Sequence, residues 1–88
     1  MTRDDTRVRI NLVSQAAQTM FGSTPGLTRV EGSRIAYEGT REVVAGIARR
    51  AEVIAQDPRS TDRARGAARA VARHCRHVLR REAGHAAG

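Results

Sequence analysis

The C-terminal half of this sequence alternates apolar and polar residues with the period of an α-helix, twice over, with Asp57-Pro58 between the two stretches. The apolar positions of the first stretch are Val43, Val44, Ile47, Ala48, Ala51, Ile54 and Ala55. Those of the second stretch are Ala64, Ala67, Ala68, Val71, Cys75, Val78 and Leu79. Steps of three and four residues put each set on one side of a helix. Because a turn of about four residues joins the two helices, they must lie antiparallel, and we predict an antiparallel helical hairpin over residues 40–82.

The ends of these two helices carry the residues that helix termini favour. Thr40 is the expected N-cap of the first helix, and Ser60 or Thr61 that of the second, because a hydroxyl accepts from a free backbone N–H of the first turn. Asp57-Pro58 ends the first helix. Residues 84–88, which follow the second helix, are expected to form a frayed tail.

The N-terminal segment allows two interpretations. A helix over residues 4–21, capped by Asp4 or Asp5, places Ile10, Val13, Ala17, Met20 and Phe21 on one face, and we favour it. The alternative is a short strand over residues 7–12, in which Val8, Ile10 and Leu12 alternate with polar residues. This six-residue alternation resembles the first strand of ribbon-helix-helix DNA-binding proteins. The Gly-rich stretch that follows departs from that family, so the chain is not assigned to it.

Residues 22–39 form the predicted Gly-rich loop or connecting arm. Gly22 and Gly26 flank Pro25, which bars its predecessor from helical geometry. The apolar residues that follow suit either a short hairpin turning at residues 31–33 or an irregular arm. A phosphate-binding loop of the P-loop type requires a lysine, and the chain has none.

Together these elements predict a mainly α fold in a single small domain of residues 1–88. Ala supplies 15 of the apolar residues, so the core should be shallow, and we expect a homo-oligomer or a member of a larger assembly. No run of about 18 apolar residues occurs. Charges interrupt the N-terminus where a secretory signal needs an apolar stretch, so we expect a cytoplasmic chain without a membrane partner.

The positive charge is concentrated in the last third of the sequence. Residues 1–58 hold eight arginines and seven acidic residues, whereas residues 59–88 hold eight arginines and two acidic residues. Such a concentrated field attracts polyanions. The expected partner is therefore nucleic acid, contacted through its backbone, or an acidic protein surface.

Five arginines of the second helix fall within an arc of about 80° on a helical wheel, away from the apolar side. We call this set the arginine stripe; it consists of Arg65, Arg69, Arg73, Arg76 and Arg80. The stripe spans about 22 Å along the helix axis. We expect no acid on the same arc, so the like charges at i,i+4 need an offset, which is phosphate or an acidic face on a partner or on the chain's first helix.

The function predicted from this stripe is nonspecific nucleic-acid binding. Only Phe21 and Tyr37 are available to stack on bases, so backbone contact is the mode that remains. Five phosphate contacts predict a slope of about −4.5 for log K against log salt. The alternative function is a structural assembly or adaptor subunit that acts by helix packing, favoured by the apolar Val53 on the polar side of its helix.

His74, Cys75 and His77 resemble a metal cluster in sequence, but a helix points them in different directions. We therefore predict no metal site and no cofactor, and interpret Cys75 as a small buried apolar residue. The serines have no companion His and Asp at a recognisable spacing, and the paired acids lie at expected helix starts. The chain is not expected to be an enzyme.

Overall fold

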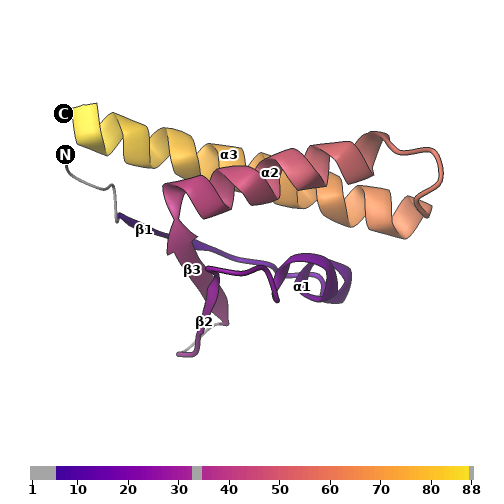
Figure 1. Ribbon diagram of the computed structural model, residues 1–88, viewed down its shortest axis with the longest axis horizontal. Coiled ribbons are helices and arrows are strands. Elements are labelled where there is room, and N and C mark those ends of the chain that lie inside the picture. The colour runs from indigo at the N-terminus through magenta and orange to yellow at the C-terminus, as the bar shows by residue number, and fades with distance from the viewer. Residues whose placement is uncertain (1–5, 33–34, 88) are drawn as a thin grey trace.

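The computed structural model describes residues 6–32 and 35–87 and has two layers, a pair of long helices lying over a small sheet (Figure 1). The elements are β1 (Arg7–Ile10), α1 (Gln15–Phe21), β2 (Thr28–Val30), β3 (Ala36–Thr40), α2 (Arg41–Gln56) and α3 (Asp62–Ala87). The mainly α prediction is therefore wrong, because a three-stranded antiparallel sheet accompanies the helices.

The N-terminal segment is a strand followed by a short helix, and the predicted helix over residues 4–21 is not formed. Val8, Ile10 and Leu12 are buried, whereas Val13, which the helical interpretation placed on the buried face, is 87% exposed. The segment forms a strand because its backbone gains hydrogen-bond partners in β3. The two strands are antiparallel, with Arg7 opposite Thr40 and Ile10 opposite Tyr37. The predicted caps Asp4 and Asp5 lie outside the described residues.

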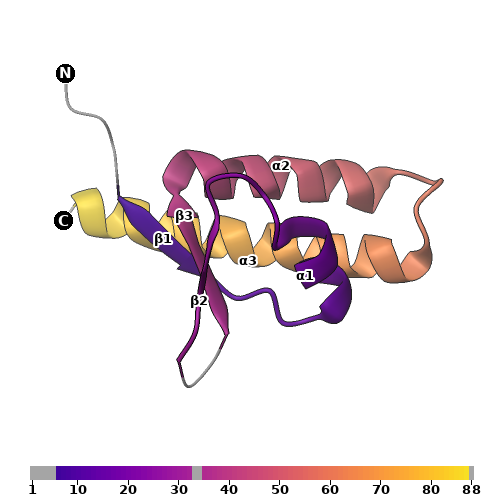
Figure 2. The same cartoon turned by 60° about the horizontal axis from the view of Figure 1, so that its bottom comes forward.

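Helix α1 begins only after the strand ends. The Ser14 hydroxyl accepts from the backbone N–H of Ala17 at 3.0 Å and caps this seven-residue helix. Ala17 and Phe21 are its buried residues. Figure 2 shows α1 beside the first turns of α3, and β1 running beside the C-terminal half of α3.

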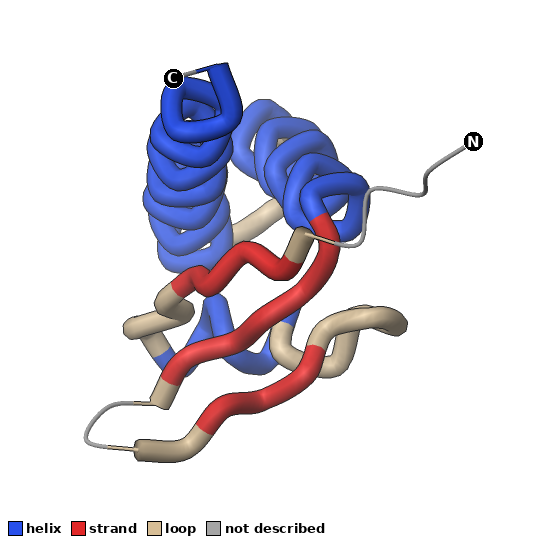
Figure 3. The backbone as a smooth tube through the Cα atoms, turned by 90° about the vertical axis from the view of Figure 1, so that its left-hand side faces the viewer, coloured by secondary structure: helices blue, strands red, loops and turns tan. Residues whose placement is uncertain are grey.

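The Gly-rich arm predicted for residues 22–39 contains two of the three strands. Strand β3 lies in the centre of the sheet, between β1 and β2, and pairs antiparallel with both (Figure 3). Of the two alternatives for this region, the hairpin is therefore the one formed. The arm was the wrong interpretation because β3 is held by β1, a partner about thirty residues away in sequence. Part of the predicted turn, Ser33, lies outside the described residues.

The C-terminal region is helical, as the apolar repeats predict. The Thr40 hydroxyl accepts from Val43 N–H at 3.2 Å, and the Thr61 hydroxyl accepts from Ala64 N–H at 3.1 Å. Asp57 ends α2, and its carboxylate accepts from Arg59 N–H at 2.9 Å in the turn. Helix α3 continues past Glu82 to Ala87.

The core lies between the helices and the sheet. Val8 and Ile10 from β1 meet Val44 and Ile47 from α2, and Phe21 from α1 joins them. The α2–α3 contact itself is lined by small buried residues, which are Ala48, Ala51, Ala68, Ala72 and Cys75. Their size allows the two backbones to approach closely.

The turn between α1 and β2 depends on Gly26. Its φ is 86°, in the left-handed region, and an added Cβ would lie 2.9 Å from Cγ2 of Val43. Both the backbone conformation and the contact with α2 therefore favour the absence of a side chain.

We predict that Gly26→Ala lowers the free energy of unfolding by about 1 to 2 kcal/mol, because a left-handed conformation costs that much for a residue with a Cβ. The measurement is urea unfolding followed by circular dichroism. Gly32→Ala is the matched control, since an added Cβ there meets no atom within 4 Å. We expect its effect to stay within about 0.5 kcal/mol. Equal stabilities of the two variants would contradict this role of Gly26.

Candidate nucleic-acid interface

The packing of α3 fixes which way the arginine stripe faces. Ala68, Ala72 and Cys75 are buried on the side of α3 that meets α2, while Val71 is buried beside the β1–α1 segment. At about 100° per residue, the stripe falls on the remaining arc, which faces away from the sheet. Arg69, Arg73, Arg76 and Arg80 are exposed, and Arg65 is half-buried. The five residues that the sequence singled out therefore share one outward face.

Two of the five arginines are bound to carboxylates of the chain. Arg65 donates to Asp62, one turn earlier on α3. Arg76 donates to Glu52 of α2. The expectation that no acid shares the arc is therefore wrong, because Asp62 lies at about 160° on the same wheel. Part of the offset that the like charges need is internal.

The other three stripe arginines have no such partner among the described residues. Among the residues that the structure describes, Arg69, Arg73 and Arg80 make no hydrogen bond or ion pair. Arg69 and Arg73 are an i,i+4 pair of like charges, which costs an isolated helix about 0.2 to 0.5 kcal/mol. The centre of the stripe is thus the part where a bound anion relieves most repulsion.

The two ion pairs are weak enough for a competing anion to displace. The side chains of Arg76 and Glu52 are 54% and 39% exposed. Exposed pairs of this kind contribute about 0.2 to 1 kcal/mol. A phosphate that replaces Glu52 as the partner of Arg76 therefore costs the chain little folding stability.

Helix α2 contributes two residues to this face that the sequence analysis missed. Arg49 is exposed and lies about 140° from the buried Val44 on the α2 wheel, which places it on the outer side of the hairpin. Glu52 lies closer to α3 and reaches Arg76. A helical wheel of α2 would have placed both residues on the outer side. The contact of Glu52 with α3 depends on tertiary packing, which the wheel does not show.

The polar face of β1, the feature shared with ribbon-helix-helix proteins, is used within the chain. Arg9 forms an ion pair with Glu38 of β3 at 3.0 Å. Arg7 donates to the Thr28 hydroxyl at 3.1 Å and to the Glu38 carbonyl at 3.2 Å. These contacts hold both guanidinium groups across the sheet, so they are not part of the candidate interface.

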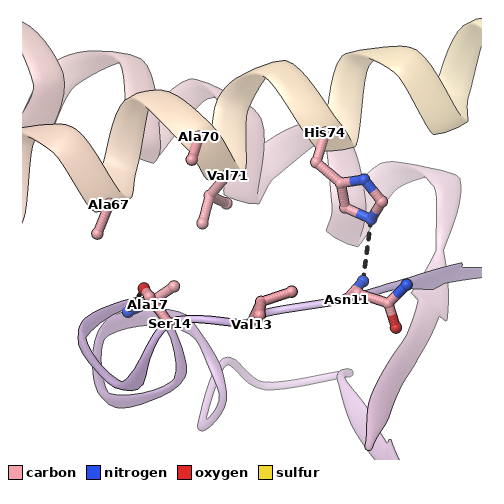
Figure 4. Close-up of a pocket in the computed structure, with 8 residues that line it drawn as sticks. All are labelled: Asn11, Val13, Ser14, Ala17, Ala67, Ala70, Val71 and His74. Carbon is pink, nitrogen blue, oxygen red and sulfur yellow. Dashed lines mark hydrogen bonds between the residues drawn. The ribbon is translucent and has the colours of Figure 1, made fainter. Parts of the chain in front are cut away.

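His74 and Cys75 have structural partners. His74 Nε2 accepts from the backbone N–H of Asn11 at 3.0 Å, which ties α3 to the end of β1 (Figure 4). Burial, and then the nearby His77, lower the pKa of His74 below its usual value. Cys75 is fully buried, and burial raises the pKa of its thiol to about 11. The prediction of a small buried residue is confirmed for Cys75, and a thiol with this pKa is a poor nucleophile at neutral pH.

Within residues 6–32 and 35–87, no three metal-ligating side chains come together. No helix in the described part of the chain has the length and apolar content that crossing a bilayer requires. Comparisons with models of protein families, with curated proteins and with solved structures find no match to this chain.

The Asn11–His74 hydrogen bond generates a prediction about pH. Only neutral His74 accepts this bond, so protonation breaks it. Because the folded pKa lies below the value of 6.5 for the unfolded chain, the unfolded state takes up the proton first. Stability is then complete above about pH 6.5 and falls as the pH drops through the folded pKa. The charged groups around His74 are His77, Arg9, Arg81 and Glu82.

We expect His74→Gln to flatten the dependence of unfolding free energy on pH between about 4.5 and 7, a window above the titration of most carboxylates. The measurement is urea unfolding at a series of pH values. His77→Gln, which alters an exposed residue, is the control and should retain most of the dependence. An unchanged pH profile in His74→Gln would refute the assignment.

Proposed function

We propose that this chain binds nucleic acid nonspecifically, by contact of the arginine stripe with the phosphate backbone, and that it acts by binding rather than by catalysis. The observation that supports this proposal is the row of exposed arginines on one face of α3, with Arg69, Arg73 and Arg80 free of ion pairs within the described residues. Guanidinium groups are suited to phosphate because they offer several N–H donors in a planar fork.

The spacing along α3 suits a repeating anion. Arg69, Arg73, Arg76 and Arg80 follow one another at three or four residues, which is about 4.5 to 6 Å along the axis. Side chains of this length adjust to successive phosphates without a fixed register. Backbone contacts position a protein on nucleic acid and carry no base information. The proposal therefore includes no sequence preference.

The alternative function, an assembly subunit that acts by helix packing, has weaker support. Val53 is 68% exposed on α2, as the sequence indicated. Val13 and Ile35 are the other large apolar side chains exposed in the described part of the chain, and they come from different segments. Single exposed apolar residues are normal on monomeric proteins. Val53 does not by itself favour assembly over nucleic-acid binding.

Salt dependence tests the proposal. Three stripe arginines make no ion pair within the described residues, so log K for a labelled 20-base-pair duplex should fall against log salt with a slope of at least about −2.7. The slope should approach the −4.5 expected for five as phosphates displace the two carboxylates. Fluorescence anisotropy between about 50 and 200 mM salt measures it. Arg69→Ala should reduce the slope by about 0.9. Arg29→Ala on β2 is the matched control, with the same loss of charge away from the stripe, and should leave the slope unchanged. Binding that is weak and independent of salt would refute the proposal.

Removing the carboxylate partner of Arg76 should strengthen duplex binding, whereas removing a stripe arginine should weaken it. Glu52→Gln removes the internal partner of Arg76 and frees it for phosphate, so duplex affinity should rise and the slope should steepen by up to about 0.9. Glu31→Gln, which removes the partner of Arg29, makes the same change in net charge and is the control. Equal effects of the two substitutions would mean that net charge alone governs binding.

A further inference from the structure

A second surface of α3 remains after the stripe and the α2 contact are accounted for. Three hollows follow one another along the side of α3 that faces α1 and β1. The first adjoins Arg63 and Ala64 of α3, the second Ala67 to His74, and the third His74 to Glu82. We call the row they form the side groove. From Ala64 to Arg81 it is about 26 Å long, at 1.5 Å per residue.

The middle of the side groove is apolar. Its central hollow has a volume of about 420 Å³ and lies between α3 and the segment that links β1 to α1 (Figure 4). Ala67, Ala70 and Val71 line it from α3, and Val13 and Ala17 line it from the opposite side. Val13 is the most exposed large apolar side chain of the described residues. A concave strip with an exposed valine at its edge favours an apolar ligand.

Each end of the side groove is lined by an exposed arginine. Arg63 lines the first hollow, and Arg81 lines the third. Neither arginine makes an ion pair with a described residue. The third hollow also contains Glu82 and Arg9, and Arg9 is already paired with Glu38. Each end therefore offers one guanidinium group that makes no ion pair within residues 6–32 and 35–87.

We propose that the side groove binds a segment of another protein that has an apolar centre and acidic residues on both sides of it. The apolar middle matches the centre of such a segment, and Arg63 and Arg81 match its two acidic ends. Recognition of an amphipathic segment in a groove beside a helix is a common mode of peptide binding. This surface lies on a different side of α3 from the stripe, so the proposal goes beyond nucleic-acid binding.

Two other occupants fit the side groove less well. Nucleic acid would have to place charged phosphates over Ala67, Ala70 and Val13, which offer them no donor. A second copy of this chain carries a net charge of +7, so two copies repel each other. Charge complementarity therefore favours an acidic partner.

Selection from a displayed library of random 16-residue peptides tests the proposal with the full chain as bait. We expect enrichment of peptides that have apolar centres flanked by Asp or Glu. Ala70→Glu, which places a charge in the apolar middle, should weaken their binding at least about tenfold. Val13→Asp gives the same test from the opposite wall, and circular dichroism verifies that both variants fold. Ala70 and Val13 are exposed, so neither change alters the core.

Charge substitutions separate the side groove from the stripe. Arg81→Glu should weaken the enriched peptides about tenfold. Arg29→Glu, the matched control on β2, should leave their affinity unchanged. The proposal would be overturned if the enriched peptides lack acidic residues, or if Ala70→Glu enriches the same peptides equally well. It would also be overturned if Arg69→Glu weakens peptide binding as much as Arg81→Glu does.

The other occupants are also outcomes of the test. Loss of duplex binding in Val13→Asp, which lies on the wall of the side groove opposite α3, would assign the side groove to nucleic acid. Self-association by sedimentation that disappears in Ala70→Glu would assign it to a second copy. Either result would overturn the proposal of an acidic protein segment. The change in slope on Arg69→Ala tests the stripe separately.

Discussion

The close contact between α2 and α3 determines how the rest of this molecule is arranged. Ala51 and Ala68 are fully buried, and because the residues lining this contact are small, the two helices meet along a narrow strip. A narrow strip occupies only part of the circumference of α3. The remaining circumference is free for two further surfaces, one against β1 and α1 and one facing solvent. The rotation of α3 that buries Cys75 is the same rotation that turns Arg69 and Arg73 outward.

The charges of α3 are balanced unevenly along its length. Asp62 and Glu52 relieve repulsion at Arg65 and Arg76, while no acidic residue of the described part of the chain pairs with Arg69 or Arg73. Repulsion of this size is small beside the packing of the helix, so α3 forms without a ligand. The repulsion between Arg69 and Arg73 is still present in the folded chain. An anion at the centre of the stripe therefore gains from relief of repulsion as well as from direct contact.

The sequence predicts the local features of this fold and misses the features that depend on distant partners. The α2–α3 pair and the caps Thr40 and Thr61 follow from periodicity and from hydroxyl groups at helix starts, which are local properties. The sheet depends on pairing of β1 with β3, which lie about thirty residues apart in the sequence. The N-terminal segment carries both a helical and a strand-like apolar pattern, so its local sequence does not decide between a helix and a strand. The stripe was visible on a helical wheel, whereas its contact with Glu52 required knowledge of which side of α2 meets α3.

The two surfaces proposed for ligands lie on one helix and cannot be electrically independent. A helix with its side chains is about 10 to 12 Å across, so a phosphate on the stripe and a carboxylate in the side groove would be separated by roughly that distance. This is close to the Debye length of about 10 Å at 0.1 M salt. Both ligands are anionic, so each would reduce the attraction of α3 for the other. Because binding coupling is reciprocal, the two effects would be equal in size, and both would fade as salt rises.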